Sequence, residues 1–439
     1  MTKYTPIIGM EVHVELNTNS KMFCGCPAHH FQIKPNTHTC PVCLGLPGAL
    51  PVPNKKALDW TILIAHAFNC HVNSYFKFDR KHYFYPDLPK GYQISQHDQP
   101  ISQNGNLILD NGRKIKINRV HLEEDTGKLL HKTIKSKKVS LIDFNRSGVP
   151  LVEVVTEPDI SSGQEAKEYL KKLRDIIRSL KVSDCDMEKG SMRLEANISL
   201  TKDIKKLPNY KVEIKNLNSF KFVDWAINYE IDRQTRLLEK GTIPEQETRG
   251  YDSKLKKTFS QRSKEESQDY RYFPEPDIPP MVFSDKEITR IKKQLPTLPE
   301  DQVKLLIKNH QINQASARLL VANEHYLQYF QTVVKSIKDI HLSPQKLANM
   351  IINKKVNINK TSPKKLISQL ANQAQSQISD TPSLTKIINQ VLSDNKPAVQ
   401  SFKKGKTNAL GFLIGQIMAQ TQGKADPQLA RKLLLEKLK

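Results

Sequence analysis

The fold is decided by the stretch Gly9-Met10-Glu11-Val12-His13-Val14-Glu15-Leu16. Apolar residues alternate there with a glycine, two glutamates and a histidine, and a period of two predicts a β-strand with one apolar and one polar face. Two carboxylates and an imidazole on one face shift one another's pKa values unless something neutralises them. The polar face therefore lies in water, as is usual for a single strand, or against a positive charge.

Four further segments show the same alternation, and each offers carboxylates on its polar side. A sheet lined in this way suits a hard divalent cation, Mg²⁺ first, because this ion prefers oxygen ligands and leaves room for substrate phosphates. A merely solvated sheet face is the alternative. The four segments are residues 119–125, 151–157, 193–199 and 211–215.

Helical patterns interrupt these strands. Residues 55–69 carry one apolar stripe, a capping-box pattern opens a helix at Ser162, and a further helix over 222–240 stops at Gly241. Strands first, and then helices inserted between more strands, indicate an α+β domain rather than a regular βαβ repeat. We expect the helices to pack behind the apolar side of the sheet.

Length and charge narrow the class of protein. The chain has 439 residues and a formal net charge of +23, with a pI near 9.5. The length allows about two to four domains, and the positive excess indicates a polyanionic partner, nucleic acid before an anionic membrane. No apolar run approaches the roughly 18 residues of a spanning helix, and no signal core follows the N-terminus. We expect a cytoplasmic protein without a membrane partner.

Four of the six cysteines form a CxC and a CxxC pair, Cys24, Cys26, Cys40 and Cys43. Two short turns that each deliver two thiolates suit a tetrahedral Zn²⁺. Four sulfurs complete the coordination, so we interpret this zinc as structural, closing a knuckle over residues 24–43. Four free thiols are the alternative, and a disulfide scaffold is not expected in a cytoplasmic chain of this size.

The C-terminal third changes character. After about residue 294 the pattern becomes helical, and residues 351–439 hold 15 Lys and Arg against 4 Asp and Glu. Gly405-Lys406-Thr407 imitates the end of a phosphate loop, but Gln400 stands where the upstream glycine is required. A basic helical surface that binds the RNA backbone is the better use of Lys403, Lys404 and Lys406; a merely soluble helical tail is the alternative.

A last cluster mixes cations with aromatic residues. Within residues 78–96, Arg80, Lys81 and Lys90 alternate with tyrosines that include Tyr83. Such a mixture suits contact with phosphates and with an unpaired RNA end on which bases stack. An ordinary loop with half-buried tyrosines explains the residue types equally well.

Several short blocks, in order along the first two-thirds of the chain, are more specific than any of these patterns. Together they resemble GatB, the tRNA-binding component of the aspartyl/glutamyl-tRNA amidotransferases (GatCAB). The blocks are residues 8–16, 18–23, 78–87, 91–96, HLEED at 121–125, DFNRSGVP at 143–150, 193–199, 215–220, 246–249 and DYRYFPEPD at 269–277.

The resemblance implies a glutamine-synthetase-like cradle built on an antiparallel sheet, with ATP and Mg²⁺ as cofactors beside the structural Zn²⁺ that the cysteine spacing predicts. It implies ATP-dependent transamidation of Glu-tRNA(Gln), Asp-tRNA(Asn) or both: the side-chain carboxylate is phosphorylated, and ammonia then displaces the phosphate. No amidase segment is recognisable in the sequence, so we expect the ammonia to arrive through a tunnel from the A (amidase) subunit of a heterotrimer with A and C. The order of segments then predicts a catalytic cradle domain at 1–293, a helical linker domain at 294–350 and a basic, tRNA-binding tail domain at 351–439.

The resemblance also implies site residues. Its metal-binding positions match Glu11, His13, Glu124 and Glu213, and Glu123, Glu153 and Glu195 remain open as further ligands. Arg193 and Lys215, each two residues from a glutamate on the same face, are candidates to hold phosphate oxygens. With Glu11, His13 and Glu124 they make up the predicted catalytic set. Arg80, Lys81, Tyr83 and Lys90 are predicted at the tRNA acceptor end or the ammonia channel.

Two other classes of protein fit the residue types. Clustered carboxylates with a basic tail would also serve a metal-dependent nuclease, for which RNA cleavage without ATP would speak. A non-catalytic RNA-binding module, in which both metals are structural, would bind tRNA and turn over no ATP. The ordered blocks favour the amidotransferase.

Overall fold

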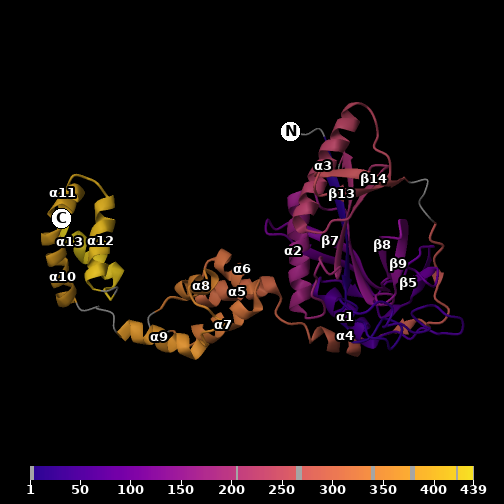
Figure 1. The fold of residues 1–439 in the computed structure, drawn as a ribbon, viewed down its shortest axis with the longest axis horizontal. Coiled ribbons are helices and arrows are strands. Elements are labelled where there is room, and N and C mark those ends of the chain that lie inside the picture. The colour runs from indigo at the N-terminus through magenta and orange to yellow at the C-terminus, as the bar shows by residue number, and fades with distance from the viewer. Residues whose placement is uncertain are drawn as a thin grey trace. The chain divides into compact units, whose positions relative to one another are not determined.

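The computed structural model describes residues 4–203, 206–263, 269–337, 342–375, 381–421 and 424–438. The chain divides into two compact units, residues 1–299 and 300–439 (Figure 1). The first unit combines a large sheet with helices and the second is helical, so the predicted α+β class with a C-terminal helical region is confirmed. No helix among the described residues combines the length and the apolar character that crossing a membrane requires.

The first unit is built on a nine-stranded sheet in which β1 is central. Strands β10 and β11 flank β1, and all neighbouring strands pair antiparallel except β12 and β13, which are parallel. In spatial order the strands are β14 (Lys257–Ser263), β13 (Glu247–Asp252), β12 (Val212–Lys215), β11 (Met192–Thr201), β1 (Thr5–Glu15), β10 (Pro150–Thr156), β7 (Lys114–Glu124), β6 (Ser102–Ile108) and β2 (His71–Val72).

Alternation along β1 divides the sheet into two faces. Met10, Val12 and Val14 are fully buried in the main hydrophobic core, while Glu11 and His13 are only partly buried. Helices α1 (Lys55–Ala67), α2 (Gly163–Ser179) and α3 (Phe220–Glu239) contribute apolar residues to the same core. The helices thus cover the apolar face, and the opposite face carries the polar side chains.

The helix ends follow the sequence signals with one difference. Ser162 caps α2 by accepting a hydrogen bond from the backbone N–H of Glu165 at 3.2 Å, as predicted. The carboxylate of Glu165, however, accepts from the backbone N–H of Ser161 rather than from that of Ser162. Arg113 holds the carboxylate in that position at 2.9 Å. Helix α3 ends before Gly241, whose φ of +78° is the left-handed conformation that glycine adopts readily.

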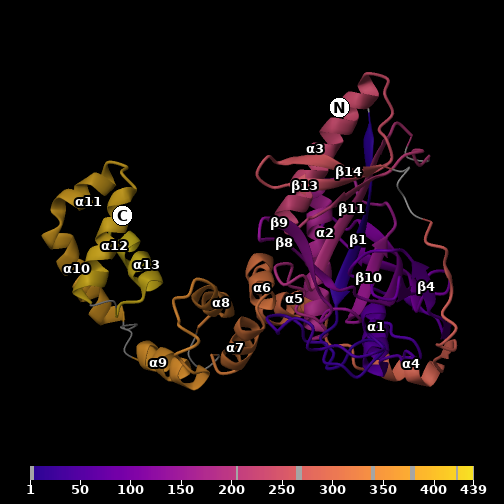
Figure 2. The ribbon, with the colours of Figure 1, turned by 45° about the vertical axis from the view of Figure 1, so that its right-hand side comes forward.

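Smaller elements surround the large sheet. β4 (Asp79–His82) pairs with β5 (Tyr92–Ser95) and β15 (Phe273–Pro274), and β3 (Tyr75–Phe76) pairs with β16 (Met281–Val282). β8 (Lys128–Ile134) and β9 (Lys137–Asp143) pair only with each other, as a hairpin that both views show outside the large sheet (Figures 1 and 2). α4 (Asp285–Lys292) closes the unit and starts with a complete capping box at Ser284.

The second unit holds two hydrophobic clusters. One gathers buried residues between Val303 and Leu370, and the other gathers buried residues between Leu384 and Leu438. Ile351, the first residue of the predicted tail domain, lies in α8 and packs in the first of these clusters. The helices are α5 (Pro299–His310), α6 (Gln314–Val321), α7 (Glu324–Val334), α8 (Pro344–Ile352), α9 (Pro363–Gln375), α10 (Thr381–Asp394), α11 (Lys396–Lys403), α12 (Asn408–Gln420) and α13 (Pro427–Leu438).

Candidate active site

Strand pairing brings carboxylates from distant segments onto the polar face of β1. The register places Glu195 of β11 beside Glu11, and Glu153 of β10 beside His13. Glu213 lies one strand further out, on β12. Directly paired residues share a face, so these side chains converge although about 200 residues separate the ends of the set.

Glu11, Glu195 and Glu213 form the acidic cluster, in which one carboxylate oxygen of each lies within 4.8 Å of the others. The ammonium of Lys215 lies 3.3 Å from Glu195 and 3.5 Å from Glu213. Burial raises the pKa of Glu195. The cluster is thus short of positive charge, and a divalent cation would relieve that deficit.

Polar neighbours orient the acidic cluster. Thr248 donates a hydrogen bond to Glu213 at 2.7 Å, and the side-chain amide of Asn197 donates one to Glu11 at 2.7 Å. The carbonyl oxygen of the Asn197 side chain is buried and has no hydrogen-bond partner among the described atoms. An unsatisfied buried acceptor beside three carboxylates favours a bound cation or a donor from a ligand.

His13, Glu123 and Glu153 form the histidine cluster, whose ligand atoms also lie within 4.8 Å of one another. His121 lies 2.9 Å from Glu153, and Ser95 donates a hydrogen bond to Glu123 at 2.9 Å. Burial disfavours a charge on His121, but Glu153 and Glu123 outweigh it and raise the pKa of the imidazole to about 9. The histidine cluster therefore already contains a positive partner.

Arg193, Arg146, Asp125 and Glu15 form the arginine network. Arg193 donates hydrogen bonds to Asp125 at 2.9 Å and to Glu15 at 2.8 Å, and Arg146 lies 3.5 Å from Asp125. Burial disfavours the carboxylate of Asp125, but the two guanidinium groups hold its pKa well below its usual range. Arg193, predicted to hold phosphate, is thus engaged by two carboxylates of the chain.

Glu124, predicted as a metal ligand, is placed in neither cluster. Its carboxylate pairs with Lys90 and accepts a hydrogen bond from the backbone N–H of Ile94 at 2.9 Å. Glu123 points toward His13 instead, because adjacent residues of a strand face opposite sides. Of the four predicted metal ligands, the structure brings Glu11 and Glu213 together and places His13 with other glutamates.

The four cysteines converge as their spacing predicts. The sulfur atoms of Cys24, Cys26, Cys40 and Cys43 lie within 4.8 Å of one another, and all four thiols are free. Hydrogen bonding from Cys24 lowers the pKa of Cys43 to about 4, with a further contribution from the ammonium of Lys21. Four sulfurs at this spacing, one of them favoured as a thiolate, fit a tetrahedral Zn²⁺.

The cations of residues 78–96 lie among aromatic rings. The guanidinium of Arg80 stacks 4.3 Å from the ring centroid of Tyr92 and forms a bidentate pair with Glu275 at 2.7 and 2.8 Å. The ammonium of Lys81 lies 4.8 Å from the ring centroid of Tyr270 and 5.9 Å from that of Tyr83. Burial disfavours its charge, but Glu123 together with neighbouring tyrosines and Glu153 raises the pKa of Lys81. In the second unit Lys403, Lys404 and Lys406 are all exposed, at the end of α11 and in the turn that follows.

Comparison with known proteins shows which family the chain resembles. The family model described as the GatB/GatE catalytic domain matches residues 6–289, and the one described as the GatB domain matches residues 303–438. The B subunit of the aspartyl/glutamyl-tRNA(Asn/Gln) amidotransferase of Thermosipho melanesiensis is 44% identical over 472 residues, covering 98% of each chain. Proteins of the same name from Thermotoga petrophila and Persephonella marina are 42% identical, covering 98% and 100% of each chain.

The chain belongs to the GatB family. The two matched regions fall within the two compact units, so the division of the structure follows the division of the family models. The acidic cluster, the histidine cluster and the cysteines all lie within the region matched by the catalytic-domain model.

The structure adds residues that the sequence reasoning missed. His121 pairs with Glu153, Asp125 holds Arg193, and Thr248 orients Glu213. The sequence could have indicated Glu123, because side chains alternate between the two faces of a strand. Glu123 lies two residues after His121, so the two side chains share a face. Nothing in the sequence alone indicates that β13 delivers Thr248, because strand order is not visible there.

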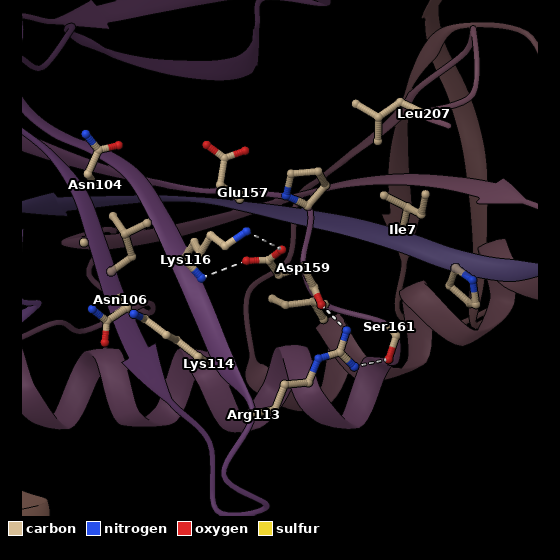
Figure 3. Close-up of a pocket in the computed structure, with 15 residues that line it drawn as sticks. Ile7, Asn104, Asn106, Arg113, Lys114, Lys116, Glu157, Asp159, Ser161 and Leu207 are labelled. Carbon is tan, nitrogen blue, oxygen red and sulfur yellow. Dashed lines mark hydrogen bonds and ion pairs between the residues drawn. The ribbon is translucent and has the colours of Figure 1, made fainter. Parts of the chain in front are cut away.

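A cavity of about 750 Å³ lies apart from the predicted residues. Figure 3 shows Lys116 paired with Asp159 and Arg113 bonded to Ser161 at its wall. None of the predicted site residues lines this cavity.

Proposed function

We propose that the chain is the tRNA-binding, ATP-using component of an aspartyl/glutamyl-tRNA amidotransferase. In this proposal it phosphorylates the side-chain carboxylate of glutamate on tRNA(Gln), of aspartate on tRNA(Asn), or of both. Ammonia then replaces the phosphate and yields the amide. The observation that carries the proposal is the convergence of the acidic and histidine clusters on one sheet face of a GatB-family chain.

The acidic cluster is the proposed seat of Mg²⁺. Three carboxylate oxygens within 4.8 Å and the unsatisfied carbonyl oxygen of Asn197 offer the hard ligands that this ion requires. When bound, Mg²⁺ neutralises charge on the β- and γ-phosphates of ATP. This ligand set keeps Glu11 and Glu213 from the sequence prediction and adds Glu195.

The chain's own cations complete the proposed site. Lys215 borders the acidic cluster. In this proposal its ammonium would hold a phosphate oxygen once a metal shares the carboxylates. The arginine network fixes the end of β7, from which Glu123 projects into the histidine cluster. Lys81, half-buried among tyrosines, is proposed at the tRNA acceptor end or at the exit of the ammonia channel together with Arg80, Tyr83 and Lys90.

The partners follow from the same proposal. We infer an A subunit that releases ammonia from glutamine, a C subunit and a tRNA whose body contacts Lys403, Lys404 and Lys406 of the basic tail. We propose that the zinc is structural. Metal analysis is expected to find one zinc per chain in the wild type and none in Cys40→Ser. Because the zinc takes no part in the chemistry, folded Cys40→Ser should still turn over ATP.

One experiment tests the function directly. The chain is incubated with mischarged Glu-tRNA(Gln) or Asp-tRNA(Asn), ATP and glutamine, with and without its A and C partners, and amidated aminoacyl-tRNA is measured. We expect amidation and tRNA-dependent ATP consumption only in the complete complex. Cleavage of RNA without ATP would indicate a nuclease, bound tRNA without ATP turnover would indicate a binding module, and glutamine hydrolysis by the chain alone would contradict the division of labour.

A further inference from the structure

The hairpin of β8 and β9 has a composition and a position that the site described above does not use. The hairpin, residues 128–143, holds five lysines and a histidine against a single acidic residue, Asp143 at the end of β9. All five lysines are exposed, and among the described residues no carboxylate forms an ion pair with any of them. The five are Lys128, Lys132, Lys135, Lys137 and Lys138.

The hairpin adds nothing to the core of the unit. Its strands pair only with each other, and no hairpin residue packs in the main hydrophobic core. Ile134 and Leu141 remain 45% and 40% exposed. The turn places Lys135 and Ser136 at φ of +48° and +65°, where glycine or asparagine is favoured. The stability of the fold therefore does not explain the lysines of this hairpin.

The root of the hairpin is fixed beside the arginine network. β8 begins three residues after Asp125, and Arg146 donates hydrogen bonds to the backbone oxygens of Thr126 at 3.0 Å and of Gly127 at 2.7 Å. A Cβ at Gly127 would lie 3.0 to 3.2 Å from Phe144, Asp87 and Asp143, so the chain is closely packed there. Seven-residue strands reach about 23 Å from such a root.

We propose that this hairpin binds the phosphate backbone of the aminoacyl arm of tRNA. The inference rests on the proposed function, because it assumes that the 3′ end of a tRNA enters the polar face of the sheet. Phosphates of the duplex that carries this end would then lie within the reach of the hairpin. Lys128, Lys132 and Lys137 share one face of the hairpin, since Lys137 pairs with Ile134 across the strands. Asp143, which lies opposite Lys128, is on the same face, so the three lysines leave a net positive charge there.

Charge complementarity selects RNA rather than an apolar partner. Unpaired lysines in a row release counterions from a phosphate backbone, and this gain requires no base-specific contact. The basic tail would contact the body of the same tRNA, so the two regions would grip different parts of one molecule.

The test compares three full-length variants in the presence of the partner subunits. The first changes Lys128, Lys132 and Lys137 to Gln, the second changes them to Arg, and the third changes the exposed Lys171, Lys286 and Lys293 to Gln as a charge-matched control. The probes are a tRNA(Gln) transcript and a minihelix made of its acceptor arm, and their affinities are measured against salt concentration.

We expect the Gln hairpin variant to bind the minihelix about tenfold more weakly, with the slope of log K against log salt reduced by about two. Its KM for Glu-tRNA(Gln) rises while kcat changes less than about twofold. The Arg variant retains affinity, and the control variant changes little. Replacement of Lys403, Lys404 and Lys406 weakens binding of the whole tRNA and leaves the minihelix unaffected.

Two results would overturn the inference. One is a Gln hairpin variant whose affinity and salt slope match those of the wild type or of the control variant. The other is a variant that loses its partner subunits while its RNA affinity is unchanged, because the hairpin would then be a protein interface. If the wild type amidates nothing and the Gln hairpin variant still binds the minihelix more weakly, the proposed function fails, and only the contact between the hairpin and the RNA backbone stands.

Discussion

The acidic cluster and the arginine network share strands β1 and β11, yet they balance charge in opposite ways. In the arginine network Glu15 and Asp125 have Arg193, Arg146 and His30 as partners. In the acidic cluster Lys215 pairs with Glu195 and Glu213, while Glu11 accepts a hydrogen bond from the neutral amide of Asn197. The arginine network therefore stabilises the fold, whereas the acidic cluster is a candidate ligand site. Proteins retain uncompensated charge at functional sites even where it lowers stability.

The largest expected effect comes from a substitution in the acidic cluster. Glu11→Gln removes a charge that we propose binds the metal, and it keeps an acceptor for Asn197. We expect a loss of tRNA-dependent ATP turnover of about 10³-fold. The free energy of unfolding should stay the same or rise, because one of three repelling carboxylates disappears. Steady-state kinetics and urea denaturation of the same sample measure both quantities, and a stability loss with full activity would reverse the assignment.

A carboxylate that already has a cation as its partner should respond in the other way, with a loss of stability. Glu124→Gln leaves Lys90 buried without its carboxylate, so the free energy of unfolding should fall by about 3 kcal/mol. Urea denaturation measures the change, and Lys90→Met in the same chain is the matched control, since it removes the stranded charge and should restore part of the stability. Unchanged stability together with lost metal binding would instead make Glu124 the ligand that the family resemblance implies.

A smaller effect is expected from the hydrogen bond that orients Glu213 in the acidic cluster. Thr248→Val keeps the shape of the side chain and removes the hydrogen bond to Glu213. Groups that orient ligands cost about tenfold in metal affinity when lost. Titration with Mn²⁺ in the presence of ATP checks this, and Thr258→Val, which alters a hydroxyl of β14 bonded to Glu230, is a control from outside the acidic cluster.

The sequence carries the alternation of the strands but not their order. Glu11 and His13 can be assigned to a polar strand face because the period of two is a local property. The neighbours Glu195 and Glu153 depend on β1 lying between β10 and β11, which only long-range packing decides. The family resemblance favours Glu124 over Glu123, although the parity of His121 and Glu123 already indicates their shared face.

The cysteines, the β8–β9 hairpin and the domain limits differ in how far the sequence predicts them. The cysteine spacing predicts the convergence of four sulfurs because two short turns leave few alternatives. The sequence does not predict the β8–β9 hairpin, since its lysines obscure the alternation and its turn lacks the usual glycine. The domain limits at 293 and 350 stay predictions; the structure divides the chain only once, after residue 299.

The central claim is that the acidic cluster, and not Glu124, holds the metal of a bound nucleotide. Binding of Mn²⁺ with ATP by the wild type, Glu213→Gln and Glu124→Gln, followed by electron paramagnetic resonance, tests it most directly. We predict that Glu213→Gln loses the bound ion and that folded Glu124→Gln retains it. Retention of the ion by Glu213→Gln, with its loss from Glu124→Gln, would contradict the claim.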